Sequence, residues 1–362
     1  MPQPKVAICA VARTPIGKFM GALSGFTAVE LGVLAVGEVC RRAGLDPSSG
    51  VIDEVIFGQV LQAGAGQNPA RQVALGAHLP YTTPCVTINK VCGSSLKAAM
   101  MASNSIRAGE YKAIIAGGME SMSNVPYYVL KARFGYKYGN AELTDGLVRD
   151  GLFEVYYKFP MGNCAENTAK EMNISRAEQD AYAIQSYQRS AAAWEAGAFA
   201  DEIVPVELQG RKGESILITE DEEYKNVKIE KIPALRAAFT KDGTVTAANA
   251  STINDGGAAL VLMSTEKAKE LNITPLAKIK SYADAAHEPK WFTTAPAKAL
   301  PKALAKANIN INEVDFFELN EAFSVVGLAN MKILGLSKEK VNVNGGAVSL
   351  GHPLGVSGAR IV

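Results

Sequence analysis

The chain has 362 residues, 48% of them hydrophobic and 20% charged, which is typical of a globular protein built from two packed halves. Lys and Arg total 37 against 36 Asp and Glu, so the net charge of +1 and the lack of a basic run do not favour a nucleic acid or a membrane surface as partner. No apolar stretch has the length of a membrane span.

The five cysteines are scattered and contain no C-x-x-C pair, so we expect neither a zinc site nor a disulfide framework. The N-terminal segment MPQPKVAICAVARTPIG enters an apolar run directly, without a secretory h-region or an Arg- and Ser-rich presequence. These features predict a reduced protein of the cytoplasm, and they leave a mitochondrial location open.

Short apolar runs alternate with helical patterns in the first part of the chain. The predicted strands are KVAICAVA, DEVIFGQV, CVTINKV and KAIIAGG. A predicted helix, TAVELGVLAVGEVCRRAG, ends at Arg41, Arg42 and Gly44, which are typical C-terminal residues. This alternation predicts an α/β fold with helices on both faces of a sheet.

The pattern recurs near the C-terminus. EVDFFELNEAF corresponds to DEVIFGQVLQA, and VNVNGGAVSLGHPLGVSGARIV corresponds to VTINKVCGSSLKAAMMASNSIR, with Asn89 and Asn344 at equivalent places. We interpret this as an internal duplication. In the second copy the counterpart of the strand KAIIAGG would fall beyond Val362, which predicts that the last strand of the second half is missing.

We therefore divide the chain into an N-terminal domain, 1–265, and a C-terminal domain, 272–362. The stretch of about 121–250 breaks the alternation and contains the helical pattern NISRAEQDAYAIQSYQRSAAAWEAG, in which Ser175 and Glu178 predict a capping box. An insertion of this length between two repeats is more typical of a substrate-handling lobe than of a connector.

Cys92 lies between the predicted strand CVTINKV and the helical run SLKAAMMASNSIRAG, beside Gly93. A thiol at a helix N-terminus is stabilised as a thiolate by the dipole and by free backbone N–H groups. The alternative is a small buried apolar side chain, which we assign to Cys9, Cys40, Cys85 and Cys164.

His352 lies in NGGAVSLGHPLGVSGAR, a Gly-rich turn that enters another helix. The duplication places this turn opposite Cys92, where an imidazole would activate the thiol; the alternative is a structural loop histidine, as for His78 and His287. Asn320 and Glu321 follow the predicted strand VDFFEL, and the end of a strand is where open α/β sheets bind ligands. Ordinary turn chemistry is the alternative for this Asn.

Together these segments resemble one family. VCGSSLKA, NEAF and GGAVSLGHPLGVSGAR are similar to three of the four signature blocks of the thiolases, and GGMESMSNVP, MGNCAENTA and TVTAANASTINDG are also thiolase-like. The resemblance runs from Met1 to Val362 and is greatest to the short-chain, acetoacetyl-CoA type of the potassium-activated mitochondrial kind. It implies a duplicated five-layered α-β-α-β-α architecture with an inserted loop domain.

The resemblance implies that Cys92 becomes acylated, that His352 accepts the thiol proton, and that His352 and an Asn320-held water bind the thioester oxygen. Ser251 and Met161 would contact the pantetheine arm of coenzyme A. Near its nucleotide end would lie Tyr187, Lys231, Lys225, Lys228 and Arg236, with a solvated loop as the alternative for the charged residues. A potassium site would be formed by Tyr187, Ala247, Ala248, Ala250 and Val348.

The implied activity is that of an acetyl-CoA C-acetyltransferase, which condenses two acetyl-CoA to acetoacetyl-CoA or catalyses the reverse thiolysis. The resemblance implies no organic cofactor beyond coenzyme A. It also implies that the chain forms a homodimer or a homotetramer. The fourth block, a Cys-x-Gly-Gly-Gly strand whose cysteine moves the proton at the acetyl methyl carbon, is absent. The alternatives are therefore a catalytically incomplete thiolase-like protein that binds coenzyme A, or a ketoacyl synthase; a papain-like hydrolase does not suit the duplicated pattern.

Overall fold

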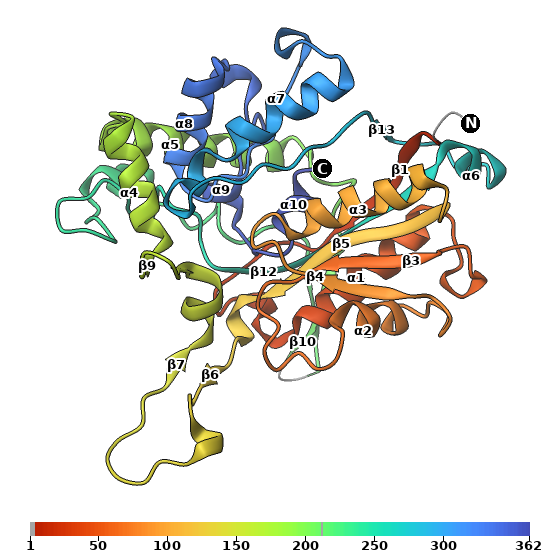
Figure 1. The fold of residues 1–362 in the computed structure, drawn as a ribbon, viewed down its shortest axis with the longest axis horizontal. Helices are drawn as coiled ribbons and strands as arrows, with labels where there is room; N and C mark the ends of the chain where they lie inside the picture. The colour runs from red at the N-terminus through yellow and green to blue at the C-terminus, as the bar shows by residue number, and fades with distance from the viewer. Residues whose placement is uncertain (1–3, 211–212) are drawn as a thin grey trace.

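The computed structural model describes residues 4–210 and 213–362. A seven-stranded sheet in the order β13-β1-β12-β5-β3-β4, with β2 paired to β12, forms the centre of the first half (Figure 1). Its strands are β1 (Val6–Arg13), β2 (Gly17–Lys18), β3 (Glu54–Gly58), β4 (Cys85–Ile88), β5 (Ala113–Ser121), β12 (Asn254–Ser264) and β13 (Ala277–Ile279). All four strands predicted in this half are present.

The sheet is mixed. β1, β12 and β5 pair antiparallel, whereas β5, β3 and β4 pair parallel. Every residue of β5 and β12 is buried, which explains why these strands are continuous apolar runs rather than alternating ones. β4 lies at the edge, and all four of its residues are only partly buried.

Helices cover both faces of this sheet, as predicted. α1 (Ala28–Arg42) and α2 (Pro69–Gly76) pack with Ile115, and α3 (Ser94–Ala108) packs with its neighbour Ile114. Successive residues of a strand point to opposite faces, so the two sets of helices lie on opposite sides. α1 ends at Arg42 as expected.

The middle of the chain carries two longer helices, α4 (Met161–Glu171) and α5 (Arg176–Glu195), and α6 (Thr265–Glu270) follows β12. The predicted capping box is present, because the Ser175 hydroxyl accepts from the Glu178 N–H and the Glu178 carboxylate accepts from the Ser175 N–H. Two-stranded sheets complete this region: β6 (Tyr127–Tyr128) with β7 (Thr144–Asp145), β8 (Phe153–Glu154) with β9 (Phe159–Pro160), and β10 (Val206–Gln209) with β11 (Ser215–Ile218).

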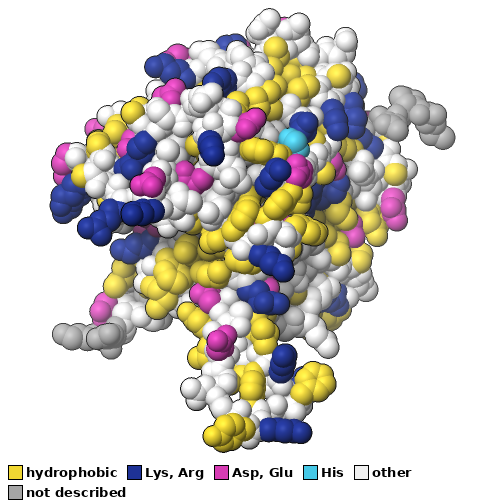
Figure 2. All heavy atoms as spheres, turned by 60° about the vertical axis from the view of Figure 1, so that its left-hand side comes forward, with side chains coloured by type: hydrophobic (Ala, Val, Ile, Leu, Met, Phe, Trp, Pro, Cys, Tyr) yellow, Lys and Arg dark blue, Asp and Glu magenta, His cyan; other side chains and the backbone are white. Residues whose placement is uncertain are grey.

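An arm, residues 127–145, runs from β6 to β7 and projects from the body of the molecule (Figure 1). Figure 2 shows apolar and basic side chains exposed along it. Its exposed large apolar residues are Tyr127, Val129, Leu130, Phe134, Tyr136, Tyr138 and Leu143. Such a concentration of exposed aromatic groups is typical of a protein interface.

The second half contributes α7 (Pro296–Ala307), α8 (Ser324–Leu334), α9 (Ala347–Leu350) and α10 (Ser357–Arg360). It does not repeat the first sheet within the described residues. β13 pairs with β1 of the first sheet, and the predicted strand VDFFEL forms only an isolated parallel bridge between Phe317 and Val341. Phe317 and Leu319 are buried while Phe316 and Glu318 are exposed, so this segment is buried on one face only.

The prediction of a missing last strand is not supported. Within the described residues, the two halves differ in how their segments pair. The duplication is visible in the two similar turns that precede α3 and α10. The helices α3 and α10 pack against each other. These turns carry Cys92 and His352.

Candidate active site

The first component of the site is the turn between β4 and α3. Val91 adopts a φ of 49°, in the left-handed region, and directs the chain so that Cys92 lies just before the helix. Hydrogen bonds fix this turn: the Val91 N–H donates to Asn89 Oδ1 (2.9 Å), the Lys90 N–H donates to Ser94 Oγ (2.8 Å), and Ser94 Oγ donates to the Val91 carbonyl (2.6 Å). A β-branched residue adopts a positive φ only when its surroundings hold it there.

The second component is His352, whose Nε2 lies 3.0 Å from Cys92 Sγ. On the other side of the ring, Nδ1 lies 2.6 Å from Ser357 Oγ, and that hydroxyl donates to the Pro353 carbonyl at 3.2 Å. Because the hydroxyl proton is used in that bond, Ser357 accepts from Nδ1–H. This tautomer leaves the Nε2 lone pair facing the thiol, which is the arrangement a base needs.

The electrostatics of the pair correct one prediction. Cys92 as a residue is half-buried, but its thiol is enclosed, and burial raises the pKa of the thiol to about 12, with the charge of Glu120 acting in the same direction. Burial, with a smaller effect of Arg360, lowers the pKa of His352 to about 3. The prediction that the helix N-terminus would by itself favour a thiolate is therefore wrong, because desolvation of the charged form outweighs it. The resting pair is a neutral thiol beside a neutral imidazole.

Asn320 is the third component. Its Nδ2 lies 3.4 Å from His352 Nε2, whereas its Oδ1 is buried without a hydrogen-bond partner among the described residues. The preceding residue is fixed by Asn342, which accepts from the Leu319 N–H and donates to the Leu319 carbonyl, both at 2.8 Å. A buried acceptor without a donor is costly, so the position of Asn320 indicates a site for a water or a substrate donor.

Glu321, the neighbour of Asn320, is buried at the centre of a hydrogen-bond network. It accepts from Tyr182 Oη (2.9 Å), Ser186 Oγ (2.8 Å), Asn342 Nδ2 (2.8 Å) and the Val348 N–H (3.1 Å). These donors come from α5, from α9 and from the segment between α8 and α9. Glu321 therefore joins the elements that carry Asn320 and His352, which makes it a structural residue rather than a reacting one.

A close approach of two backbones positions the His352 turn on the sheet. A Cβ at Gly118 of β5 would lie 2.0 Å from the Gly355 carbonyl oxygen. The obstacle is backbone, which has little freedom to shift. Only glycine at 118 lets the His352 turn pack this closely against β5.

We expect Gly118→Ala to push the His352 turn away from β5, lower the free energy of unfolding by about 1–3 kcal/mol, and slow any reaction at Cys92. Thermal unfolding and the rate of Cys92 alkylation measure the two effects. Gly37→Ala is the control, because no atom lies within 4 Å of its added Cβ and alanine is favoured in the helix. A Gly118→Ala protein as stable and reactive as Gly37→Ala would contradict the steric argument.

Two residues predicted to contact the pantetheine arm lie near these groups. Ser251 is half-buried, and both its Oγ and its N–H donate to the Ala322 carbonyl, at 2.9 and 3.0 Å. It therefore lies beside the segment that carries Asn320. Met161 is half-buried and begins α4.

The residues predicted for the potassium site and the nucleotide end are only partly brought together. Tyr187, Ala248 and Val348 pack in one buried cluster with Ile232. Lys231 is exposed on the adjoining segment, Ala247 is exposed, and Ala250 belongs to a neighbouring cluster around Phe323. No group of three or more His, Cys, Asp or Glu suited to a metal occurs in the described part of the chain.

The other cysteines and histidines fit their structural assignment. Cys9, Cys40 and Cys164 are buried, Cys85 is half-buried on the edge strand, and none of the five cysteines is in a disulfide. Burial raises the pKa of each of these four thiols. His78 and His287 are exposed.

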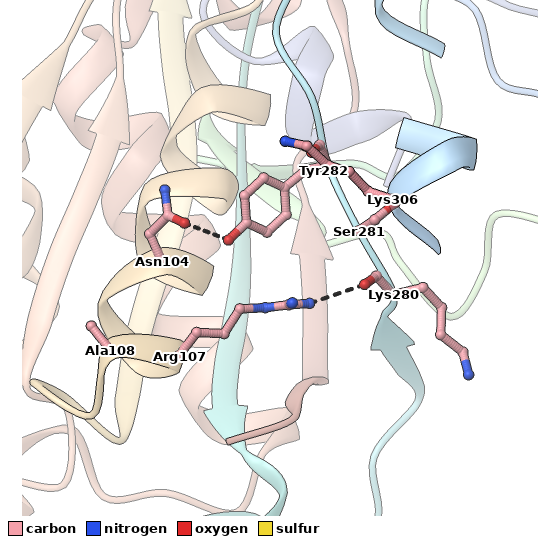
Figure 3. Close-up of a pocket in the computed structure, with 7 residues that line it drawn as sticks. All are labelled: Asn104, Arg107, Ala108, Lys280, Ser281, Tyr282 and Lys306. Carbon is pink, nitrogen blue, oxygen red and sulfur yellow. Dashed lines mark hydrogen bonds between the residues drawn. The ribbon is translucent and has the colours of Figure 1, made fainter. Parts of the chain in front are cut away.

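A surface cavity of about 490 Å³ lies at the opposite end of α3 from Cys92, roughly 20 Å away by the helix rise. Figure 3 shows its lining: Asn104, Arg107, Ala108, Lys280, Ser281, Tyr282 and Lys306. Arg107 donates to the Ile279 and Lys280 carbonyls, and Tyr282 donates to Asn104. The cavity contains none of the predicted site residues, so its size does not make it the reacting site.

Sequence reasoning missed three residues that hold the site. Ser357 fixes the imidazole, Asn254 Oδ1 accepts from the His352 N–H at 2.7 Å, and Glu120 accepts from the Gly355 N–H at 2.8 Å. Glu120 had a visible signal, because it is the only charged residue in an otherwise apolar and small-residue strand. The other two depend on how the turn folds.

A cysteine faced by a neutral, oriented imidazole, with an unpaired amide oxygen beside them, defines an enzyme class that carries a transferred group on the cysteine. The comparisons with known proteins agree with that class. The family model described as "Thiolase, N-terminal domain" matches residues 6–266, and "Thiolase, C-terminal domain" matches residues 273–362. The chain belongs to the thiolase family.

Individual relatives are similar over nearly the whole chain. It is 54% identical to Acetyl-CoA acetyltransferase 2 of Arabidopsis thaliana over 99% of this chain and 89% of that protein. It is also 54% identical to the mitochondrial acetyl-CoA acetyltransferase of Bos taurus, over 99% of this chain and 84% of that protein. The structure of the Acat5 thiolase of Ascaris suum in complex with coenzyme A superposes with a TM-score of 0.94, at 48% identity, over 99% of this chain and 91% of that one. The predicted α/β thiolase fold is thus confirmed.

Proposed function

We propose that this thiolase is an acetyl-CoA C-acetyltransferase that works through an acetyl-Cys92 thioester. The observation that carries the proposal is the 3.0 Å contact between Cys92 Sγ and His352 Nε2. The names of the relatives, all acetyl-CoA acetyltransferases at 53–54% identity, support acetyl-CoA as the substrate. They favour this function over the catalytically incomplete alternative.

The acylation step uses the pair in its resting state. As Cys92 Sγ attacks the thioester carbonyl of acetyl-CoA, the thiol proton passes to His352 Nε2, and Ser357 keeps the ring oriented through Nδ1. The tetrahedral intermediate collapses with cleavage of its bond to the coenzyme A sulfur, which takes the proton from His352 as it leaves. The proton never needs to reach solvent, so the raised pKa of Cys92 is no obstacle to transfer at neutral pH.

The environment of Asn320 supports its expected role, which is to hold a water that stabilises the negatively charged thioester oxygen. Its unpaired, buried Oδ1 can accept from a water, and that water and His352 Nε2–H can both donate to the thioester oxygen as it becomes negative. Each hydrogen-bond donor that is already in place for a developing negative charge increases the rate by about 10²–10³-fold. For the condensation, a base takes a methyl proton from a second acetyl-CoA, and the methyl carbon attacks the acetyl-Cys92 carbonyl. The tetrahedral intermediate collapses with cleavage of its bond to Cys92 Sγ, which takes up the proton that the methyl group lost.

Coenzyme A is proposed as the bound group, in keeping with the coenzyme A complex of the Ascaris suum thiolase. Ser251 and Met161 would line the pantetheine arm, and Tyr187 and Lys231 would lie near the nucleotide end. The potassium site at Tyr187, Ala247, Ala248, Ala250 and Val348 stays a prediction. The buried cluster that joins Tyr187 to Ala248 and Val348 supports it, and oxygen ligands would suit a hard cation.

A homodimer or homotetramer is also proposed. The exposed aromatic side chains of the arm and the edge strand β4 support an assembly, since both are surfaces that proteins usually cover. We retain the division into domains 1–265, including the lobe of about 121–250, and 272–362. None of the helices in the described ranges is long and apolar enough to cross a membrane. The compartment, cytoplasm or mitochondrion, stays a prediction.

The proposal is tested by incubating the protein with acetyl-CoA and measuring the mass of its Cys92 peptide, alongside an assay of acetoacetyl-CoA thiolysis. We expect an acetyl adduct on Cys92 and turnover, and both should disappear in Cys92→Ala. Cys85→Ala is the matched control, because Cys85 is also half-buried but its Sγ donates to the Thr83 carbonyl rather than to an imidazole. An adduct without turnover would favour the incomplete enzyme, and no adduct at all would reject acyl transfer.

A further inference from the structure

Glu120 is a fully buried carboxylate close to the reacting pair that the acyl-transfer steps do not use. It lies on the central strand β5 and has an exposed fraction of 0%. No lysine or arginine forms an ion pair with it among the described residues. A buried, unpaired carboxyl is expensive to maintain, so its presence needs an explanation.

The carboxylate is bound by three backbone N–H groups from two different loops. Oε2 accepts from Val60 (3.0 Å) and from Gly355 (2.8 Å), and Oε1 accepts from Leu61 (3.1 Å). Val60 and Leu61 follow β3, whereas Gly355 belongs to the turn that begins at His352. One side chain therefore ties both loops to the sheet.

Each of these loops contacts one partner of the reacting pair. The Val60 carbonyl accepts from Asn89 Nδ2 at 3.3 Å, and Asn89 fixes the turn before Cys92. Cys92 also packs against an apolar cluster that contains Val60, Leu61 and Leu354. The distance between Sγ and Nε2 thus depends on a frame that has Glu120 at its centre.

The charge of Glu120 acts on the same pair. Burial raises the pKa of Glu120 to about 7, the three N–H donors oppose that shift, and Asp255 on the adjacent strand adds to it. The titratable groups that interact with the charge of Glu120 are Asp255 from β12 and Cys92 from the nucleophile turn. The negative carboxylate disfavours a second negative charge on Cys92.

We propose that Glu120 is a positioning residue for acyl transfer, which holds the Cys92 and His352 loops in one frame and whose charge adds to burial in keeping the free thiol protonated. The thiol is then protected from alkylation and oxidation between turnovers, because the thiolate is the reactive form. The turnover part of this proposal depends on the proposed function, whereas the effect on the free thiol does not.

Two substitutions separate position from charge. Glu120→Gln keeps the length but removes the charge, and its NH₂ group faces backbone N–H donors that need an acceptor. Glu120→Asp keeps the charge but is one methylene too short to reach both loops. Asp53→Asn is the matched control, since the Asp53 carboxylate also accepts from two backbone N–H groups, those of Lys112 and Ala113, but at the opposite end of β5 from Glu120.

The readouts are the pH midpoint for alkylation of Cys92 by iodoacetamide, and kcat and KM for acetoacetyl-CoA thiolysis. For Glu120→Gln we expect the midpoint to fall by about one pH unit and kcat to fall by about 10–100-fold, with KM little changed. For Glu120→Asp we expect a similar loss of kcat and a midpoint near that of the wild type. Asp53→Asn should change neither the midpoint nor kcat.

The proposal is overturned if the Glu120→Gln midpoint stays at the wild-type value, or if Asp53→Asn shifts it equally. If Glu120→Gln does not fold, the Glu120→Asp protein tests the positioning role. An unchanged kcat in Glu120→Asp would contradict that role. A wild-type protein that is alkylated at Cys92 but shows no thiolysis would reject the proposed function while the alkylation comparison still tests the charge of Glu120.

Discussion

Replacing His352 with glutamine is expected to slow acetylation of Cys92 by about 10²–10⁴-fold. The thiol has a pKa raised to about 12 by burial, so at neutral pH nearly all of it is protonated and depends on a neighbour to accept the proton. Glutamine is similar in size to histidine but cannot act as a base. The measurement is the rate of appearance of the acetyl-Cys92 peptide after rapid mixing with acetyl-CoA.

The control for this loss is His287→Gln, at an exposed histidine far from the pair in sequence. It should acetylate at the wild-type rate. The His352 variant should also recover at high pH, because the thiolate then forms without a base. A variant that acetylates normally at pH 7 would show that another group accepts the proton.

Replacing Glu321 with alanine is expected to lower the free energy of unfolding by about 3 kcal/mol or more, since four buried donors lose their acceptor together. Those donors are Tyr182, Ser186, Asn342 and the Val348 N–H, which belong to elements that surround the site. Urea unfolding followed by circular dichroism measures the change. Because Glu321 itself touches no reacting atom, activity should be lost mainly as the protein unfolds.

Glu321→Gln should cost less than alanine, because an amide oxygen retains some of the bonds. Glu339→Ala is the surface control: its side chain is 69% exposed and forms one long ion pair of 3.6 Å with Arg189, so we expect a change within about 0.5 kcal/mol. Equal destabilisation by Glu321→Ala and Glu339→Ala would mean that the buried network contributes nothing.

Local sequence signals predicted much of the first half. The four apolar runs became β1, β3, β4 and β5, because strands buried on both faces need continuous apolar residues. The capping box at Ser175 was predicted equally well, since it depends only on residues three apart. The pairing of Cys92 with His352 came from the duplication, which placed two similar turns opposite each other.

The long-range pairing of strands and the pKa values of buried groups could not be predicted from the sequence. The run around Phe317 has strand composition, but whether it joins a sheet depends on partners far along the chain, and its alternate residues prove to be exposed. The pKa of Cys92 depends on how deeply its sulfur is enclosed, which no residue pattern records. Ser357 is only five residues from His352, yet their contact requires the particular turn at Pro353.

The left-handed conformation of Val91 has a consequence for anyone who engineers this chain for heat resistance. Such a backbone position costs about 1–3 kcal/mol, so Val91 is an obvious target and glycine an obvious replacement. Glycine would relieve the strain, but it would also free the turn to adopt conformations that aim the Cys92 sulfur elsewhere. At this residue, higher thermal stability and correct placement of the Cys92 sulfur are opposed. Selection of variants by melting temperature alone would therefore favour a more stable protein whose Cys92 reacts more slowly.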